Sequence, residues 1–278
     1  MNARELEWAR GVMQARSART VARIQSLWRG YGEIVRVAFE DGLASTAIVK
    51  RVSPPSGEAN TASDVRKRRS YDVEHAFYER YSARCTDACR VARLYGAQRD
   101  ESGWTFVLAD LDAAFPVRRD PARGHALEAC LAWLAAFHAR FMNDAGDGLW
   151  PQGTYWHLAT RLDELAIDPA RAHELDRALA SARFRTILHG DAKEANFCFA
   201  RDERAVAAVD FQYAGRGCGM KDVAYLLHGH PDAYLDAYFR SLRAKLRGVD
   251  ADALEREWRA LFPIAQQDFA RFLAGWRG

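Results

Sequence analysis

The residues with the clearest chemical potential stand in two short stretches near residue 200. The first is His189-Gly190-Asp191-Ala192-Lys193-Glu194-Ala195-Asn196, and the second is Asp210-Phe211-Gln212. Strands are predicted at 197–199 and 205–209, with a polar turn at 201–204 between them. Antiparallel neighbours lie about 5 Å apart, so this hairpin is expected to deliver Asp210 beside Asn196.

One carboxylate and one carboxamide at a single point suit Mg²⁺, which takes oxygen ligands and keeps water and phosphate oxygens in its shell. Asp191 follows a predicted strand at 186–188 and is placed to accept a proton from a hydroxyl. Lys193 reaches the same point as a positive charge for a phosphate. Asp, Asn and Gly are also ordinary turn residues, which explains any one of these positions better than it explains the joint pattern.

Two further charged residues stand among apolar neighbours, where a charge is costly. Lys50 lies inside a predicted strand at 47–52, and Glu74 lies in an aromatic helical stripe within 71–81. The two would satisfy each other if that helix packs on that strand. The alternative is that both side chains extend to solvent at the edge of the sheet. Gly30-Tyr31-Gly32 precedes another predicted strand at 33–39 and would let backbone amides approach phosphates, although two glycines are a weak signal.

Composition excludes several classes of protein. The chain has 278 residues, 49% hydrophobic and 28% charged, which is enough for a large domain or two lobes and too apolar for wholesale disorder. No stretch of eighteen apolar residues or signal-peptide pattern occurs, so we expect a cytoplasmic protein that does not span a membrane. Five scattered cysteines indicate reduced thiols, although Cys85 and Cys89, one helical turn apart, leave a metal or redox pair open.

The charge pattern argues against nucleic acid as a partner. The formal net charge is only +3, and just five of the 40 basic residues are lysines, so a lysine at a special position is informative. The run Arg66-Lys67-Arg68-Arg69 is interpreted as a solvated loop leading into a helix, with a nucleic-acid patch as the alternative.

The pattern of elements predicts an α+β fold with two lobes. Residues 1–110 are rich in strands, after a first segment, 1–29, with helical spacing. Residues 111–278 are rich in helices, expected at 124–141, 158–183 and 222–276. A small strand-rich lobe for nucleotide binding and a larger helical lobe for catalysis and acceptor binding would leave the cleft between them as the natural ligand site.

The order of Lys50, Glu74, the H-G-D stretch and D-F-Q resembles the aminoglycoside phosphotransferase and choline kinase-like branch of the protein-kinase-like fold. The run Gly215-Arg216-Gly217-Cys218-Gly219-Met220-Lys221-Asp222 looks most similar to ecdysteroid-kinase-like (CHK-type) proteins. The resemblance covers roughly residues 25 to 240. It implies a bilobal fold and an enzyme that moves the γ-phosphate of ATP to a hydroxyl with the help of Mg²⁺.

In the second lobe, the resemblance implies that Asp191 is the catalytic base and that Lys193 lies near the γ-phosphate. Asn196 and Asp210 would hold Mg²⁺. Gln212 stands where protein kinases have glycine, so a flip of this segment of the protein-kinase type is not assumed.

In the first lobe, the resemblance implies that Lys50 holds the α- and β-phosphates and that Glu74 orients it. The strand ending near Asp110 would be the hinge that contacts adenine, and Gly30 and Gly32 would belong to an abbreviated glycine loop over the phosphates.

The expected acceptor is a small hydroxylated molecule. Only 68 residues follow Asp210 and they contain no A-P-E signature, which leaves little room for a peptide-docking platform. Candidate pocket residues, each also a candidate for ordinary core, are Trp150, Tyr155, Trp156, Tyr213, Arg216, His228 and His230. The aromatic segment 148–164 has Asp163 and Glu164 as its only acids, which argues against a polycation.

Three functions remain open from the sequence. The first is the small-molecule kinase. The second is a nucleotide-binding regulatory protein of the same fold without turnover (a pseudokinase), and the third is a nucleic-acid-binding module. The identity of the acceptor, ATP against GTP, and a monomer against a homodimer are equally open, as is the packing of the last apolar helices on the lobe or on a partner.

Overall fold

The computed structural model describes residues 1–54, 61–162, 165 and 167–276. The chain divides into two compact units. Unit 1 comprises Met1–Arg84 and Val91–Ala114, and unit 2 comprises Cys85–Arg90 and Phe115–Gly278. The predicted assignment of nucleotide binding to 1–110 and of catalysis to 111–278 stays a prediction.

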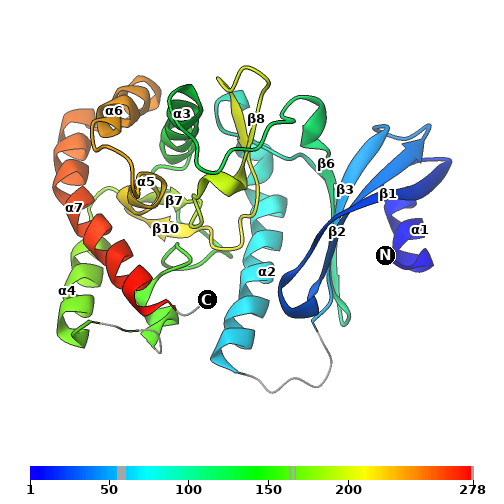
Figure 1. Ribbon diagram of the computed structural model, residues 1–278, viewed down its shortest axis with the longest axis horizontal. Helices are drawn as coiled ribbons and strands as arrows, with labels where there is room; N and C mark the ends of the chain where they lie inside the picture. Colours follow the sequence, from blue (N-terminus) through cyan, green and yellow to red (C-terminus); the bar gives the residue numbers. More distant parts are fainter. Residues whose placement is uncertain (55–60, 163–164, 166, 277–278) are drawn as a thin grey trace. The chain divides into compact units, whose positions relative to one another are not determined.

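Unit 1 is built on a five-stranded antiparallel sheet with the strand order β1-β2-β3-β6-β5 (Figure 1). Its strands are β1 (Ser17–Ser26), β2 (Gly32–Glu40), β3 (Thr46–Val52), β5 (Leu94–Asp100) and β6 (Gly103–Ala109). The predicted strands at 33–39 and 47–52 and the strand expected to end near Asp110 are confirmed as β2, β3 and β6. The expectation of helix throughout 1–29 is wrong beyond residue 12, because β1 is an edge strand whose mostly exposed residues show no alternation between apolar and polar positions.

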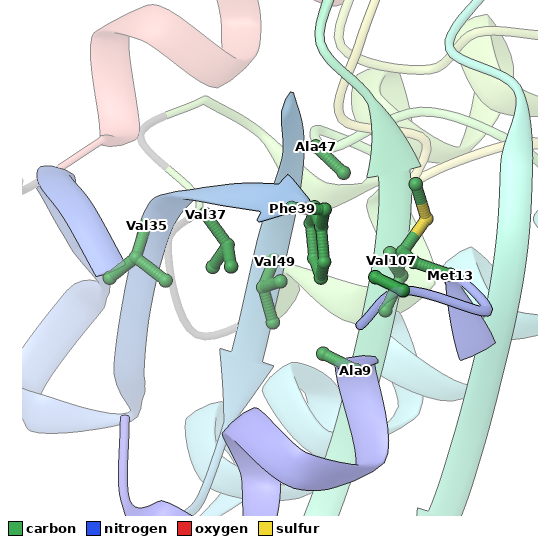
Figure 2. Packing of buried hydrophobic residues seen from close by; sticks show 9 residues of the cluster. Ala9, Met13, Val35, Val37, Phe39, Ala47, Val49 and Val107 are labelled. Carbon is green, nitrogen blue, oxygen red and sulfur yellow. The ribbon is translucent and has the colours of Figure 1, made fainter. Parts of the chain in front are cut away.

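The first helix, α1 (Ala3–Val12), covers one face of this sheet. It begins at Asn2, whose side chain accepts from the Glu5 amide while the Glu5 carboxylate accepts from the Asn2 amide. Figure 2 shows the core that results, in which Ala9 and Met13 lie against the alternate, inward residues of β2, β3 and β6. These strand residues are Val35, Val37, Phe39, Ala47, Val49 and Val107.

The second helix, α2 (Ala62–Arg80), contacts β5 and β6. Lys50 and Val49 are successive residues of β3 and therefore point to opposite faces of the sheet. Phe106, paired with Lys50 in the register, contacts the rings of His75 and Tyr78 on α2. The helix thus lies on the face of Lys50. The basic run at 66–69 belongs to α2, so its interpretation as a loop is wrong. The part of the expected loop at 55–60 lies outside the described residues.

Unit 2 contains most of the helices. They are α3 (His125–Arg140), α4 (Pro169–Ala180), α5 (Met220–Leu226), α6 (Tyr234–Lys245) and α7 (Ala251–Gly275), with α3 against α6 and both α4 and α5 against α7 (Figure 1). Phe262, Phe269 and Phe272 of α7 are buried within the unit, whereas Trp276 is exposed. The apolar residues of the last helix thus pack mainly on their own unit, as one of the two alternatives predicted.

Four short strands of unit 2 carry the loops of interest. These are β7 (Thr186–Leu188), β8 (Phe197–Phe199), β9 (Val206–Ala208) and β10 (Gly215–Gly217). The predicted hairpin is confirmed, with Phe197 opposite Ala208. The strand β10, which pairs with β7, was not predicted because two of its three residues are glycine.

Short elements complete the chain: the strand β4 (Arg90–Val91) and the 3₁₀ turns η1 (Trp28–Gly30), η2 (Ser82–Arg84), η3 (Asp87–Cys89), η4 (Leu111–Ala113), η5 (Leu158–Thr160) and η7 (Glu194–Asn196). The helices expected within 158–183 thus reduce to η5 and α4 among the described residues. No helix in the described part of the chain combines the length and the apolar character needed to cross a bilayer.

Candidate active site

One buried carboxylate accepts hydrogen bonds from the backbone of the loop between β7 and β8. Asp222, in the first turn of α5, accepts the backbone amides of His189 at 2.7 Å and of Gly190 at 2.9 Å. His138 of α3 lies 3.2 Å from the same carboxylate through Nε2 and 2.7 Å from the Tyr238 hydroxyl through Nδ1. All these groups are buried, so the loop has a rigid polar support.

Gly190 is required by the path of the loop. Its φ is +83°, and a Cβ at this position would lie 1.9 Å from the carbonyl oxygen of Tyr213. The carbonyl oxygen of Gly190 accepts the amide of Tyr155 at 2.7 Å. A side chain would therefore force the loop away from two neighbouring segments, and Asp191 would move with it.

Asp191, Lys193 and Asn196 meet at the end of this loop. The Asn196 Nδ2 donates to the backbone oxygen of Asp191 at 2.8 Å and to its Oδ2 at 2.9 Å. The Lys193 Nζ lies 3.1 Å from the same Oδ2, and Asp191 is 5% exposed. Because Asn196 uses its amide nitrogen for these bonds, its Oδ1 is the atom that it can offer to a cation.

Asp210 joins this group through the predicted hairpin. The amide of Val209 donates to the Asn196 carbonyl oxygen at 3.0 Å, which fixes the neighbouring Asp210 beside the loop. Burial works to lower the pKa of Lys193, but Asp191 and, more weakly, Asp210 raise it above its usual value. Asp210 has a left-handed backbone with φ +68°, a conformation that Asp tolerates better than most residues and that clusters at functional sites.

His189 belongs to the support of this site. Burial holds its pKa below the usual value, against the opposing effect of Asp222 and other carboxylates. Its Nε2 lies 3.0 Å from the Val209 carbonyl oxygen, and its Nδ1 accepts the Asp191 amide at 3.3 Å. A neutral imidazole that donates through Nε2 and accepts through Nδ1 therefore ties both sides of the hairpin together.

The donor set at this point fits Mg²⁺. A carboxylate from Asp210 and the Asn196 Oδ1 supply two hard oxygen atoms, and Asp191 supplies a second carboxylate nearby. Such an incomplete oxygen shell leaves positions for water and phosphate oxygens, which Mg²⁺ keeps in its shell in phosphoryl-transfer sites.

In unit 1, Lys50 and Glu74 form the predicted pair. The Lys50 Nζ lies 2.8 and 2.7 Å from the two carboxylate oxygens of Glu74. Lys50 is 5% and Glu74 1% exposed, which excludes the alternative that both extend to solvent. The Tyr71 ring lies 5.8 Å from the same ammonium group.

Asp110, one of the predicted nucleotide contacts, has a local structural role. The Asp110 carboxylate pairs with Arg36 at 2.6 Å and accepts the amide of Asp112, which opens η4. Burial tends to raise the pKa of Asp110, but the contacts with Arg36 and Asp112 lower it overall. The side chain predicted to belong to the nucleotide site is therefore engaged by its own unit.

Gly30 and Gly32 lie in the turn between β1 and β2. Gly30 has φ +76° with open space around it, whereas a Cβ on Gly32 would lie 2.0 Å from the Arg51 carbonyl oxygen. Close pairing of β2 with β3 thus explains Gly32, and only Gly30 has room for a substituent.

One aromatic residue contacts Asp191, and further aromatic residues of unit 2 pack near it. Tyr225 of α5 is hydrogen-bonded to Asp191, which together with the larger effect of burial raises the pKa of the Tyr225 hydroxyl. The Tyr155 ring contacts Tyr213 at 4.9 Å and Phe272 at 5.6 Å between centroids. Tyr155 was predicted as an acceptor candidate, whereas Tyr225 was missed because its signal in the sequence is one aromatic residue in an apolar helix.

The other acceptor candidates have defined contacts of their own. Trp150 donates its Nε1 to the Gln212 carbonyl oxygen at 2.9 Å, and the His228 ring contacts Phe269. His230 lies 3.1 Å from the Glu194 carboxylate. Trp156 is fully buried, and Arg216 lies on β10 opposite Ile187. Asp163 and Glu164 lie outside the described residues.

Cys85 and Cys89 lie close together in unit 2. A hydrogen bond with Cys85 is the main cause that lowers the pKa of Cys89 to about 6. Within the described residues, nowhere do three or more His, Cys, Asp or Glu side chains gather as metal ligands.

A model of the Phosphotransferase enzyme family matches residues 24–262 of this chain. No curated protein matches it. Solved structures with a similar fold include macrolide 2'-phosphotransferase MphH from Brachybacterium faecium, with 16% identity, a TM-score of 0.54 and coverage of 93% of this chain and 90% of that one. A putative fructosamine-3-kinase from Thermobifida fusca has 19% identity, a TM-score of 0.52 and coverage of 94% and 89%.

A third similar structure is aminoglycoside phosphotransferase APH(4)-Ia in a ternary complex with ADP and hygromycin B. It has 11% identity and a TM-score of 0.50, with coverage of 98% of this chain and 99% of that chain. At such identities the likeness concerns the fold, which is the predicted bilobal protein-kinase-like α+β fold. The finer resemblance to ecdysteroid-kinase-like proteins stays a prediction.

Proposed function

Because the chain belongs to the Phosphotransferase enzyme family, we propose that it moves the γ-phosphate of ATP to a hydroxyl of a small molecule. The observation that carries the proposal is the meeting of Asp191, Lys193, Asn196 and Asp210 at one point of unit 2. A base, a cation and two metal ligands are the groups that phosphoryl transfer needs, since the reaction depends on positioning and charge neutralisation.

In the proposed reaction, Asp191 accepts the proton of the acceptor hydroxyl. The hydroxyl oxygen forms the new bond to the γ-phosphorus, while the bond from that phosphorus to the β–γ bridging oxygen breaks and ADP leaves with the electron pair. Lys193 places a positive charge beside the phosphoryl oxygens. Asn196 and Asp210 would hold Mg²⁺, which when bound neutralises phosphate charge and orients the phosphates.

The proposal assigns the rest of the nucleotide to unit 1. Lys50, oriented by Glu74, would hold the α- and β-phosphates as a cation that its own unit keeps in place. Gly30 and Gly32 would cover the phosphates by backbone amides. Because the Asp110 carboxylate is engaged with Arg36, the adenine contact proposed near this residue would use the backbone.

The small size of the acceptor is supported by the fold relatives. The macrolide 2'-phosphotransferase, the fructosamine-3-kinase and the complex with hygromycin B are all named for small molecules. We therefore propose a small hydroxylated acceptor and no nucleic-acid partner. The cytoplasmic location expected from the sequence is part of the same proposal.

The test compares Asp191→Asn with the wild-type protein and with Asp202→Asn, which makes the same change of charge in the exposed turn of the hairpin. Transfer of labelled γ-phosphate from ATP to a panel of hydroxylated compounds, and to water, would be measured with Mg²⁺. General-base catalysis contributes about 10²–10⁴-fold, so Asp191→Asn should lose at least 100-fold in turnover.

Nucleotide binding separates this role from a loss of folding. Asp191→Asn should bind Mg-ATP within a few-fold of the wild-type affinity, and Asp202→Asn should keep full turnover. Full activity of Asp191→Asn would overturn the assigned role. Tight Mg-ATP binding by a wild-type protein that turns over neither acceptor nor water would favour the nucleotide-binding regulatory protein instead.

A further inference from the structure

A second group of charged side chains is buried in unit 2, apart from the residues assigned to phosphoryl transfer. Lys221 of α5 and Asp268 and Arg271 of α7 are 1%, 0% and 3% exposed. The Asp268 carboxylate lies 2.8 Å from the Arg271 Nε and 3.6 Å from the Lys221 Nζ. We call Lys221, Asp268, Arg271, Trp156 and His157 the buried cation cluster.

The segment before α4 closes the cluster on another side. The Trp156 ring lies 4.5 Å from the Lys221 Nζ, and the Trp156 carbonyl oxygen accepts the Arg271 Nη2 at 3.0 Å. Burial and the charges of Lys221 and Arg271 lower the pKa of His157 to about 3, so this imidazole is neutral. In the fully buried part of the cluster, Lys221 and Arg271 thus face the single carboxylate of Asp268, so positive charge is in excess there. A second carboxylate, that of Asp176, is 20% exposed and lies 3.6 Å from the His157 Nδ1 at the edge of the cluster.

Several polar atoms of the cluster lack a hydrogen-bond partner. They are the Lys221 Nζ, the Arg271 Nη1, the Trp156 Nε1, the His157 Nδ1 and the Asp268 Oδ2. Three of these atoms can only donate and one can only accept. A buried group without a partner costs free energy, and a buried cation more so. The surplus of donors and of positive charge therefore fits an occupant that accepts hydrogen bonds and is negatively charged.

The cluster lies against the aromatic residues beside Asp191. Lys221 and Tyr225 are four residues apart on α5 and so share one face of the helix, with Tyr225 hydrogen-bonded to Asp191. Tyr225 also contacts Phe269, and Trp156, Phe269 and Phe272 form one apolar cluster with Tyr155 and Tyr225 packed on it. One side of α5 thus connects the buried cations with the base.

We propose that the buried cation cluster binds a carboxylate or phosphate group of the acceptor, whose hydroxyl then reaches Asp191. This inference rests on the proposed kinase function and adds to it the chemical class of the substrate, a hydroxylated anion. A polycationic acceptor is incompatible with Lys221 and Arg271 at this place, because like charges in the interior repel strongly.

Direct binding tests the cluster without any turnover. Inorganic phosphate would be titrated at constant ionic strength into the wild-type protein and into Lys221→Met, Lys193→Met and Lys245→Met. Lys221→Met should raise the phosphate dissociation constant at least tenfold. Lys245→Met, at the end of α6, should change it less than twofold. Lys193→Met removes the cation beside Asp191 and so reports any phosphate bound at the phosphoryl-transfer site instead.

Two results of this titration would overturn the inference. One is a wild-type protein that does not bind phosphate, which would mean that water alone fills the cluster. The other is phosphate binding that depends on Lys193 and ignores Lys221, which would place the anion at the phosphoryl-transfer site. Trp156→Phe removes the Nε1 donor and leaves a smaller aromatic ring in its place. If Lys221→Met does not fold, several-fold weaker phosphate binding by Trp156→Phe provides the same test.

Assays with different acceptors show whether the cluster binds an anionic group of the substrate or only free phosphate. Hydroxy acids and their neutral amides would be compared as acceptors with Mg-ATP. The wild-type protein should have an at least tenfold higher kcat/KM for the acids than for the amides. Lys221→Met should lose this difference because its KM for the acids rises, while its kcat stays the same. An active enzyme that uses acids and amides equally well refutes the inference. Failure of the kinase proposal shows separately, as absence of Mg-ATP binding in a protein that still binds phosphate.

Discussion

The pair of Lys50 and Glu74 yields the sharpest stability prediction. Both residues are at least 95% buried, and the ammonium lies within 2.8 Å of both carboxylate oxygens. Lys50→Met keeps most of the apolar stem and removes the charge. The Glu74 carboxylate then loses the Lys50 ammonium group in the interior, which costs far more than the loss of an exposed ion pair.

Protonation of Glu74 limits the magnitude of this loss. A carboxyl group with an unfolded pKa of about 4.3 takes up a proton at pH 7 at a cost of roughly 4 kcal/mol, and breaking a buried pair costs about 3–5 kcal/mol. We therefore expect Lys50→Met to lose about 3–4 kcal/mol of folding free energy at pH 7. Because folding of the variant then binds a proton, the deficit should shrink by about 1.4 kcal/mol for each pH unit below 7 until about pH 4.3.

Urea denaturation at pH 7 and pH 5 measures both quantities. Lys245→Met is the matched control, since it makes the same substitution at the end of α6, and it should lose less than about 0.5 kcal/mol. The double variant Lys50→Met/Glu74→Leu should recover most of the loss, because replacing a buried pair by apolar residues is often close to neutral. The reasoning would be refuted if Lys50→Met and Glu74→Leu alone each lost under about 1 kcal/mol of folding free energy and these two losses added in the double variant.

Three further changes probe the supports of the site. Asp222→Asn leaves two backbone amides with one good acceptor, so it should lower the folding free energy in urea denaturation by about 1–3 kcal/mol and also lower turnover. Unchanged stability would show that the loop needs no such support. The pKa of His157 is lowered from about 6.5 to about 3 in the folded state, so the unfolded state binds the extra proton and stability falls as pH drops below 6.5. His157→Gln should reduce the slope of folding free energy against pH below 6.5 by up to about 1.4 kcal/mol per pH unit relative to wild type. Equal slopes for the two proteins would contradict this. Gly32→Ala should unfold more readily than Gly30→Ala in thermal denaturation without nucleotide, since only the former clashes with the Arg51 backbone; equal losses would remove the structural explanation of Gly32.

Hydrophobic alternation and paired charges made much of the fold predictable from the sequence. The alternation in β2 and β3 and the length of α3 follow from the residues themselves. The Lys50–Glu74 pair was predictable because each charge stands among apolar residues of the sequence, where a charge is costly without a partner. The hairpin that brings Asp210 to Asn196 followed from a turn of known length between two apolar segments.

Other features depend on tertiary contacts that leave no local signal. The strand β1 forms because its backbone pairs with β2, although its exposed side chains do not alternate. The support of the loop by Asp222 joins residues more than thirty positions apart. The buried cation cluster likewise joins α5, α7 and the segment at 156–157, and the scarcity of lysine was a hint in the sequence that Lys221 has a special position.

The most direct test of the proposed function is the Mg²⁺ dependence of ATP binding. Thermal denaturation with ATP, with and without Mg²⁺, would be compared for the wild-type protein and Asp210→Asn, a substitution that tolerates the left-handed backbone at this residue. At about a hundred times its dissociation constant, Mg-ATP should add roughly 2.7 kcal/mol to the wild-type folding free energy. We predict a shift that requires Mg²⁺ and is lost in Asp210→Asn; a wild-type protein that no nucleotide stabilises would contradict the proposed kinase.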